Sequence, residues 1–347
     1  MRILEETGLT YDDVQLVPVH NTISSRFVEE VSTRTNIFPT IGKYISVPII
    51  SANMDTVTED RMARAIHKMG GLGIIHRFMT PEEQRKQLHD LGSILKVGCI
   101  GVGARARDRM HEIGEKCDAV LVDIAHGDSD AMVEQIRWLK ESEWKTLPVI
   151  AGNIATEDGA HRLIRAGADC LKVGVGPGSL CTTRIQTGVG IPQLTAVIDV
   201  SKVARKADRP ITVIADGGIR QSGDIAKAIA AGADAVMVGS LFAGTEQTPG
   251  KVFSESGDQW NTYKIYRGMA SREAQESWKG YARAIEGERK KVRYKGSVEP
   301  IFKALEEGLR SSMTYLNARD LDTFRKHAAF MRQTAAGVRE SHPHGLF

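Results

Sequence analysis

The sequence has few cysteines, and their spacing suggests neither a metal site nor a redox pair. Its 347 residues contain four cysteines, with no Cys-x-x-Cys pair and no cysteine-histidine spacing typical of zinc ligands. So few cysteines fit a reducing compartment, and we expect a cytoplasmic protein. The first residues do not join a basic segment to an apolar core, and no apolar run has the length of a membrane span. We therefore expect no signal peptide and no membrane partner.

A strong net charge is also missing. The 46 basic and 43 acidic residues give a formal net charge of +3, which is too small to indicate nucleic acid as a partner. The composition, 41% hydrophobic and 26% charged, is that of an ordinary globular chain. A chain of this length can form one large domain or two smaller ones.

Short apolar segments alternate with longer amphipathic segments along most of the chain. The predicted strands are Val47 to Ile50, Leu72 to Ile75, Gly98 to Gly101, Ala119 to Asp123, Val149 to Ala151, Cys170 to Val173, Ile211 to Ala215 and Ala235 to Val238. The predicted helices include Asp60 to Met69, Pro81 to Leu88, Asp130 to Lys140, Asp158 to Ala166, Gln193 to Lys206 and Ser222 to Ala231. Strands that are apolar throughout are typical of a parallel sheet covered on both faces. Eight of them with intervening helices predict a (β/α)8 TIM barrel, and we expect one barrel domain over residues 1–347. A doubly wound sheet is the alternative, but no Gly-x-Gly-x-x-Gly follows the first strand.

Small and polar residues directly follow the predicted strands. They are Ser51 to Asn53, His76 and Arg77, Asp123 to Gly127, Gly152 and Asn153, Gly174 to Cys181, Asp216 to Gly218, and Gly239 and Ser240. The carboxyl ends of barrel strands gather at one face, where the active sites of this fold form. The sequence therefore predicts a site at that face.

One cysteine, Cys181, lies in the glycine-rich segment from Gly174 to Gln193, directly before two threonines and Arg184. The backbone N–H groups of such a loop can approach an anion closely. A thiol beside hydroxyls and a cation is a candidate nucleophile, and the arginine can lower its pKa. The alternative is a buried cysteine that packs as a small hydrophobe, but glycine, serine, threonine and arginine are poor core neighbours.

Several of these loops offer groups for a mononucleotide. The groups suited to a phosphate are Ser179, Gly217, Gly218, Gly239 and Ser240. Asp216 has two acceptor oxygens for the ribose hydroxyls. A tight turn is the other interpretation of Asp-Gly-Gly, but the Gly-Ser pair after the next strand favours phosphate binding.

The segment of residues 251–296 is long and polar, and it is rich in charged and aromatic side chains. Such a segment predicts a lid over the site, with a disordered surface loop as the alternative. Two further helices are expected, from Ser297 to Leu309 and from Leu321 to Phe330.

Six motifs together resemble the IMP dehydrogenase / GMP reductase family. They are SANMDTVTE (Ser51 to Glu59), the cysteine loop, ADGGIRQSGD (Ala215 to Asp224), VMVGSLFAGTEQTPG (Val236 to Gly250), YRGMAS (Tyr266 to Ser271) and YKGSVE (Tyr294 to Glu299). The resemblance extends over nearly the whole chain and implies a barrel enzyme of purine nucleotide metabolism. Many members carry a paired regulatory (CBS) domain inserted early in the barrel, whereas the helix and strand signals here leave no room for one.

The resemblance implies a covalent mechanism. Cys181 would add to purine C2 as a thioimidate, with Thr183 and Glu286 as the acid–base pair. A solvated charge in a Glu/Lys/Arg run is the alternative for Glu286. Further substrate contacts are implied for Tyr266, Arg267, Gly268, Met269 and Ala270, with Tyr266 at the phosphate and the backbone of Met269 and Ala270 at the base.

The resemblance also implies a nicotinamide dinucleotide, a cation and an oligomer. The residues implied for the dinucleotide are Asn53, Asp123, Ala125, His126, Gly152 and Asn153, although His126 can also be read as a surface-loop histidine. A K+ site would use the carbonyls of Gly176, Gly178 and Cys181 together with Glu340, Ser341 and His342 of a neighbouring subunit. A frayed terminus is the alternative for this tail. The implied assembly is a homotetramer.

The family contains two opposite reactions, and the motifs divide between them. Ala52-Asn53-Met54, the DIAHGDS segment from Asp123 and the short stretch from Met269 to Glu286 resemble the reductase. The dehydrogenase has an adjacent Arg-Tyr pair that activates water, whereas Tyr281 and Arg283 are separated and reversed here. MDTVTE, the ADGGIRQSGD block and the Glu-Ser-His tail resemble the dehydrogenase.

We expect an NADPH-dependent GMP reductase, with an NAD+-dependent IMP dehydrogenase as the alternative. Arg105 and Arg107 are candidates for a 2′-phosphate contact, although a solvated helix start explains them equally well. Two other classes stay open. A purine sensor needs no nucleophilic thiol, and a flavin-dependent barrel would be coloured when purified.

Overall fold

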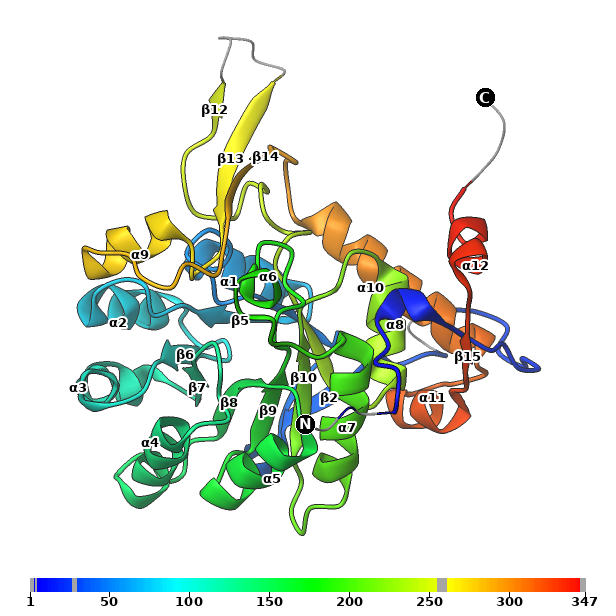
Figure 1. The fold of residues 1–347 in the computed structure, drawn as a ribbon, viewed down its shortest axis with the longest axis horizontal. Helices are drawn as coiled ribbons and strands as arrows, with labels where there is room; N and C mark the ends of the chain where they lie inside the picture. The colour runs from blue at the N-terminus through cyan, green and yellow to red at the C-terminus, as the bar shows by residue number, and fades with distance from the viewer. Residues whose placement is uncertain (1–2, 4, 27–29, 255–260, 344–347) are drawn as a thin grey trace.

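The computed structural model describes residues 3, 5–26, 30–254 and 261–343, and eight parallel strands at its centre close into a barrel (Figure 1). Around the barrel the strands follow the order β10-β11-β4-β5-β6-β7-β8-β9. Their bounds are β4 Ile49–Ser51, β5 Leu72–Ile75, β6 Val97–Ile100, β7 Ala119–Asp123, β8 Val149–Ile154, β9 Cys170–Val173, β10 Thr212–Asp216 and β11 Ala235–Val238. The structure thus confirms the predicted TIM barrel.

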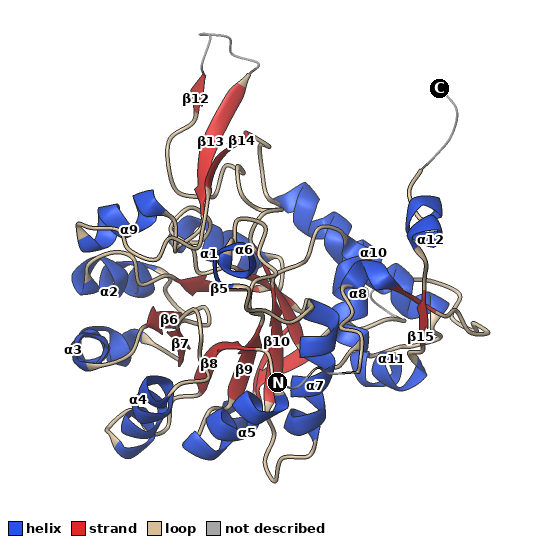
Figure 2. Cartoon of the chain, viewed as in Figure 1, coloured by secondary structure: helices blue, strands red, loops and turns tan. Residues whose placement is uncertain are grey.

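Helices surround the barrel on its outside (Figure 2). Those that follow successive strands are α1 Asp60–Lys68, α2 Pro81–Asp90, α3 Ala104–Ile113, α4 Asp130–Glu141, α5 Glu157–Ala166, α7 Gln193–Arg205, α8 Ser222–Ala230 and α10 Glu299–Tyr315. The short helix α6, Thr183–Thr187, precedes α7. From β4 to β11 each connection is a loop with one or two of these helices, so no domain is inserted there. None of the described helices is long and apolar enough to cross a lipid bilayer.

Local sequence signals explain why several helices begin where they do. Thr80 caps α2 in a capping box with Glu83, and Pro81 occupies the first turn. Ser129 and Thr156 accept a backbone N–H at the starts of α4 and α5. These caps set where each helix leaves its strand, and therefore where the loops at the open end of the barrel lie.

The sequence prediction differs from the structure mainly at the ends of elements. Each predicted strand corresponds to a barrel strand, although β8 continues to Ile154 and supplies Asn153 from within the strand. The helix predicted from Leu321 to Phe330 ends earlier, as α11 Leu321–His327. Phe330 instead begins β15 Phe330–Arg332, which pairs with β1 Val14–Leu16, because strand pairing between distant segments overrides the local helical pattern.

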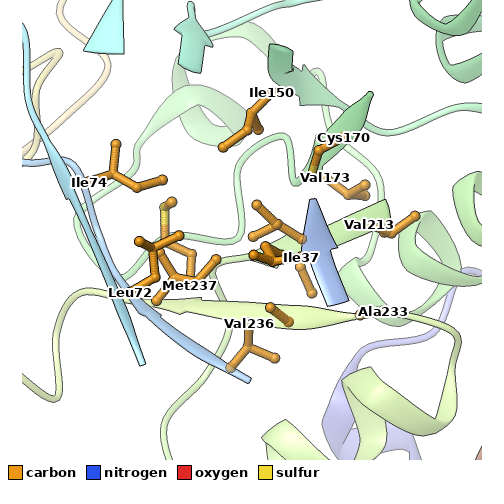
Figure 3. Close-up of a cluster of buried hydrophobic side chains, with 14 of the residues drawn as sticks. Ile37, Leu72, Ile74, Ile150, Cys170, Val173, Val213, Ala233, Val236 and Met237 are labelled. Carbon is orange, nitrogen blue, oxygen red and sulfur yellow. The ribbon is translucent and has the colours of Figure 1, made fainter. Parts of the chain in front are cut away.

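A hairpin of β2 Thr35–Phe38 and β3 Lys43–Ile45 lies at the amino-terminal end of the barrel. Its Ile37 is fully buried among barrel side chains that include Val213 and Met237 (Figure 3). The Thr212 hydroxyl donates a hydrogen bond of 3.0 Å to the Ile37 carbonyl. Apolar side chains thus fill this end of the barrel, and the opposite end is left for a site.

The segment after β11 forms a small antiparallel sheet that projects from the barrel (Figure 1). Its strands are β12 Phe253–Ser254, β13 Thr262–Arg267 and β14 Arg289–Arg293, and helix α9, Arg272–Lys279, lies between the last two. Residues 255–260 of the predicted lid lie outside the described residues. The last helix in the described residues is α12, Ala335–Glu340, which lies at the edge of the molecule and away from α6 in Figure 1.

Candidate active site

A cavity of about 520 Å³ opens at the carboxyl ends of the barrel strands. Its walls come from strand ends, from the cysteine loop and from the segment between β13 and β14. The predicted site residues that line it are Asn53, Asp123, Ala125, Asn153, Gly176, Gly178, Ser179, Cys181, Thr183, Asp216, Gly217, Tyr266, Gly268, Met269, Ala270 and Glu286. The structure thus brings most of the predicted residues to one cavity.

Three side chains at this cavity form a hydrogen-bonded chain. The Cys181 thiol lies 3.1 Å from the Thr183 hydroxyl oxygen, and that hydroxyl donates 2.7 Å to the Glu286 carboxylate. A proton can therefore move between sulfur and carboxylate through one hydroxyl. Such a chain is a way to activate a nucleophile and later to supply a proton to a leaving group.

Backbone hydrogen bonds hold the two ends of this relay together. The Thr182 N–H donates 3.0 Å to the Glu286 carbonyl, and the Glu288 N–H donates 3.0 Å to the Leu180 carbonyl. The Glu286 N–H in turn donates 3.1 Å to the Ala270 carbonyl. The cysteine loop and the residues after α9 thus form one unit, which explains how Glu286 reaches Thr183.

The cysteine loop owes its course to a glycine and an arginine. Gly174 has φ +150°, and a Cβ there would lie 2.1 Å from the Asp216 carbonyl oxygen, so only glycine lets the loop start against β10. Arg184 folds back and donates to the carbonyls of Val175 and Ile191. The expectation that Arg184 acts on the thiol is therefore not supported, because its guanidinium braces the loop backbone instead.

One end of the cavity presents hydroxyls and glycine backbone. The hydroxyls of Ser179 and Tyr266 lie 3.4 Å apart. Gly239 does not line the cavity itself, but a Cβ there would be 3.1 Å from the Tyr266 oxygen. Burial raises the pKa of Tyr266, so its hydroxyl remains a neutral donor at physiological pH. Gly217 has φ +96° and a Cβ there would meet Pro177 at 2.9 Å. This end can therefore donate several hydrogen bonds to an anion.

A few predicted site residues point elsewhere. The Arg267 guanidinium pairs with Asp55, with its Nε 2.9 Å from the carboxylate, and Arg267 does not line the cavity. Gly218 faces the Tyr11 ring, and the Ser240 carbonyl accepts a hydrogen bond from Lys295. These three positions shape the walls rather than line the cavity.

A second wall of the cavity is built around Asp123 at the end of β7. Its carboxylate accepts 3.0 Å from the Asn53 amide and pairs with the Lys172 ammonium at 2.9 Å. Burial disfavours its charge, but Lys172 and Arg77 outweigh burial and hold the pKa of Asp123 below its ordinary value. Asp123 is thus an ionised acceptor at neutral pH. Gly152 supports it as its strand partner, whereas His126 is exposed and lies outside the lining.

Lys172 is a cavity residue that the sequence prediction missed. It sits in the middle of β9 with only 3% of its side chain exposed, and its ammonium contacts Asp123, Asn153 and Asp216. The available signal was a single lysine within the apolar run Cys-Leu-Lys-Val. A charge buried in a barrel strand needs partners of opposite sign, and these come from the ends of β7 and β10.

An aromatic and cationic wall closes the side of the cavity near α9. The Arg77 guanidinium lies 4.7 Å from the Phe78 ring centroid and 5.6 Å from that of Trp278. Phe78 and Trp278 meet edge to face, with centroids 5.6 Å apart. The Arg77 Nε is buried and has no hydrogen-bond partner in the described part of the chain. Arg77 lines the cavity and therefore carries an unused donor at this wall.

A second cavity of about 610 Å³ adjoins the first and shares Arg77, Ile124, Trp278 and Lys279 with it. Arg105 lines this second cavity. Arg107 does not, because its guanidinium lies 5.5 Å from the Trp138 ring. The two arginines, equivalent in the sequence, are thus separated by the structure.

Of the residues predicted for a cation site, only those of the cysteine loop lie at the first cavity. Gly176 and Gly178 line the first cavity, and the Gly178 carbonyl accepts the Cys181 N–H at 3.0 Å. In this chain the Ser341 hydroxyl, after α12, interacts with Gln15 and Gln333 instead. Among the described residues, no three His, Cys, Asp or Glu side chains are grouped to hold a metal ion.

Comparisons with known proteins agree with the barrel fold. The family model of the IMP dehydrogenase / GMP reductase domain matches residues 8–344. Inosine-5′-monophosphate dehydrogenase of Borreliella burgdorferi is 36% identical, covering 99% of this chain and 98% of that protein. The enzyme of the same name from Cryptosporidium parvum is 38% identical, covering 98% and 95%. A crystal structure of GMP reductase from Trypanosoma brucei with guanosine 5′-monophosphate superposes with a TM-score of 0.91 and 32% identity, covering 99% of this chain and 98% of that one.

Proposed function

Because this chain belongs to the IMP dehydrogenase / GMP reductase family, we propose that it is a GMP reductase that converts GMP to IMP and ammonia with NADPH. The relay of Cys181, Thr183 and Glu286 carries this proposal. Reductive deamination needs a nucleophile at purine C2 and a proton for the departing amine, and the relay offers both.

The residues of this chain would act in the following order. The Cys181 sulfur bonds to purine C2 and its proton passes through Thr183 to Glu286. The 2-amino group then takes a proton from the same relay and leaves as ammonia, so that a thioimidate joins sulfur to C2. NADPH supplies the hydride. When hydride reaches C2, the carbon–sulfur bond breaks and the thiolate is restored. The sum is GMP, NADPH and two protons giving IMP, NADP+ and ammonium.

The remaining cavity residues suit a bound purine nucleotide. Asp216, fixed by Asn153 and Lys172, would accept the ribose hydroxyls. Ser179, Gly217, Gly239 and Tyr266 would hold the phosphate at the end of the cavity where they meet. The backbone of Gly268, Met269 and Ala270 would face the base.

The wall around Asp123 and the second cavity would hold a nicotinamide dinucleotide. Asn53, Asp123 and Ala125 would face the nicotinamide. Arg77 lines both cavities, and its guanidinium, whose Nε has no partner among the described residues, would suit a pyrophosphate oxygen. Arg105, in the second cavity, would select the 2′-phosphate of NADPH.

The position of Tyr281 favours the reductase over the dehydrogenase. Tyr281 is 57% exposed and lines only the second cavity, whereas Arg283 lines the first. The Arg283 guanidinium lies 5.8 Å from the centre of the Tyr281 ring, but only Arg283 lines the cavity that contains Cys181. This arrangement does not favour an Arg-Tyr pair that acts together on a water at the thioimidate. The second candidate, IMP dehydrogenase, is favoured by the curated relatives above, both of which carry that name.

Further properties belong to this proposal. We take α9 and the residues up to β14 as the lid, because they carry Glu286 and Trp278 over the cavity. A homotetramer with K+ held by the cysteine loop and a neighbour's carboxyl-terminal tail would complete the enzyme. We also propose that the chain forms one catalytic domain and acts in the cytoplasm.

Absorbance of reduced nicotinamide tests the proposal directly. One reaction contains GMP and NADPH, and the other contains IMP, NAD+ and K+. Loss of absorbance in the first, with ammonium released in equal amount, is expected. A rise only in the second would replace the proposal with the dehydrogenase, and no change in either would refute both.

A further inference from the structure

The floor of the first cavity contains one cation between two carboxylates. The Lys172 ammonium lies 2.6 Å from the Asp216 carboxylate, 2.9 Å from that of Asp123 and 2.5 Å from the Asn153 amide oxygen. An ammonium has three N–H donors, so these partners use all of them. Lys172 thus has a fixed position with no donor left for solvent or ligand.

The two carboxylates come from strands that are separated by β8 and β9 in the barrel. Asp123 ends β7 and also accepts from Asn53, whereas Asp216 ends β10 and also accepts from the Asn153 amide. Asp123, Asn153 and Asp216 all line the cavity. One lysine therefore links the wall proposed for the nicotinamide to the wall proposed for the ribose.

We infer that Lys172 is a positioning residue that holds the ribose-binding and nicotinamide-binding carboxylates in one geometry, so that the two ligands are aligned with each other. This inference rests on the function proposed above. Hydride transfer needs the nicotinamide carbon and purine C2 close together in a fixed orientation. A rigid link between the two anchoring carboxylates meets that requirement without touching either ligand.

A purely structural ion pair in the same barrel looks different. Lys140 contacts Asp169 at 2.7 Å and the Leu147 carbonyl at 2.9 Å, near the amino-terminal end of β9, and Asp169 is also paired with Arg209. None of these residues lines the first cavity. Lys172, in contrast, has only cavity-lining partners.

Loss of the lysine would leave two carboxylates without their shared cation. Burial disfavours the charge of Lys172, but Asp123 and Asp216 outweigh burial and raise its pKa, so it stays charged across neutral pH. Lys172 is also the main group that lowers the pKa of Asp123 against burial. Without Lys172 the pKa of Asp123 rises. As the pH is lowered, Asp123 is then protonated earlier, and binding that needs its ionised form is lost at a higher pH than in the wild type.

The test compares Lys172→Met with Lys140→Met by calorimetric titration with GMP and, separately, with NADP+. Lys172→Met should weaken both ligands by about tenfold or more, the usual size of one lost hydrogen bond to a charged group. As the pH is lowered, its NADP+ affinity should begin to fall at a higher pH than that of the wild type. Lys140→Met should leave both affinities and the pH profile unchanged. Asp216→Asn should weaken only GMP, and Asp123→Asn only NADP+.

Weakening of one ligand alone, or of neither, by Lys172→Met would overturn the inference. If Lys172→Met does not fold, as judged by circular dichroism, Lys172→Arg provides the test. This variant keeps the charge but not the three short contacts, so both affinities should fall while the pH profile stays. Unchanged affinities in Lys172→Arg would also overturn it. A wild-type protein that binds neither ligand would refute the proposed function instead.

Discussion

The Thr183 hydroxyl donates 2.7 Å to the Glu286 carboxylate, although these residues lie in separate segments of the chain. The same hydroxyl oxygen lies 3.1 Å from the Cys181 sulfur. A threonine between a thiol and a carboxylate can pass a proton in either direction. This one contact therefore joins nucleophile activation to protonation of the leaving group.

Replacement of the carboxylate should separate chemistry from binding. Glu286→Gln keeps the shape of the side chain but cannot accept and return a proton. We expect kcat for GMP to fall by about 10²- to 10⁴-fold, the usual contribution of general acid–base catalysis, with GMP affinity nearly unchanged. Steady-state kinetics and calorimetry measure the two effects.

Glu288→Gln is the matched control for this variant. Glu288 lies two residues away, and its carboxylate is half exposed and paired with Lys290. Its kcat should stay close to that of the wild type. A Glu286→Gln enzyme that loses GMP affinity but keeps kcat would show that Glu286 binds substrate and does not transfer protons.

Alkylation should mark a single thiol. Burial raises the pKa of Cys99 and of Cys117 to about 12, and also raises that of Cys170, whereas Cys181 is partly exposed. At pH 8, iodoacetamide should therefore modify Cys181 first and abolish turnover, because the thiolate is the reacting form. Mass spectrometry of the peptides identifies the site, and bound GMP should slow the reaction.

Cys181→Ala completes this test. It should bind GMP and show no turnover, because no thioimidate can form. Cys170→Ala alters a core thiol away from the cavity and should retain activity. Turnover by Cys181→Ala would exclude the covalent mechanism.

Close packing of α1 on β5 predicts a stability effect away from the site. A Cβ at Gly73 would lie 2.5 Å from the Ala63 Cα, so Gly73→Ala must push helix and strand apart. We expect a loss of about 1–3 kcal/mol in the free energy of unfolding, the usual cost of overpacking. Gly223→Ala in α8 is the control, because its Cβ meets nothing within 4 Å. Denaturant titration should show the control to be neutral or slightly stabilised, and an equal loss in both variants would contradict the packing argument.

The barrel could be predicted from the sequence because its signals are local. Eight short apolar segments separated by amphipathic ones identify parallel strands, and Gly174 to Cys181 could be recognised from composition alone. Local patterns do not predict the secondary structure of a segment when its pairing with a distant segment determines it. Phe330 reads as part of a helix but pairs with Leu16 in a strand.

Side-chain partners were harder to predict for the same reason. Arg184 follows the nucleophile in sequence, yet its guanidinium turns to the backbone of its own loop. Trp278 packs on Phe78 from a segment about 200 residues away, and no periodicity indicates such a contact. Lys172 was missed because a single lysine in a strand does not reveal that two aspartates from other strands surround it.

The two arginines that the structure separates provide a test of cofactor choice. Arg105 lines the second cavity, whereas Arg107 stacks on Trp138 on the outside of the barrel. If Arg105 pairs with the 2′-phosphate, Arg105→Ala should raise the KM for NADPH by about tenfold or more and leave the KM for NADH nearly unchanged, because NADH lacks that phosphate. Arg107→Ala removes the same charge nearby and should change neither value. Initial rates with both cofactors at saturating GMP measure the difference.

Equal increases in the KM values for NADPH and NADH would mean that Arg105 contacts a part common to both cofactors. Equal effects of the two variants would indicate only the loss of a general positive field.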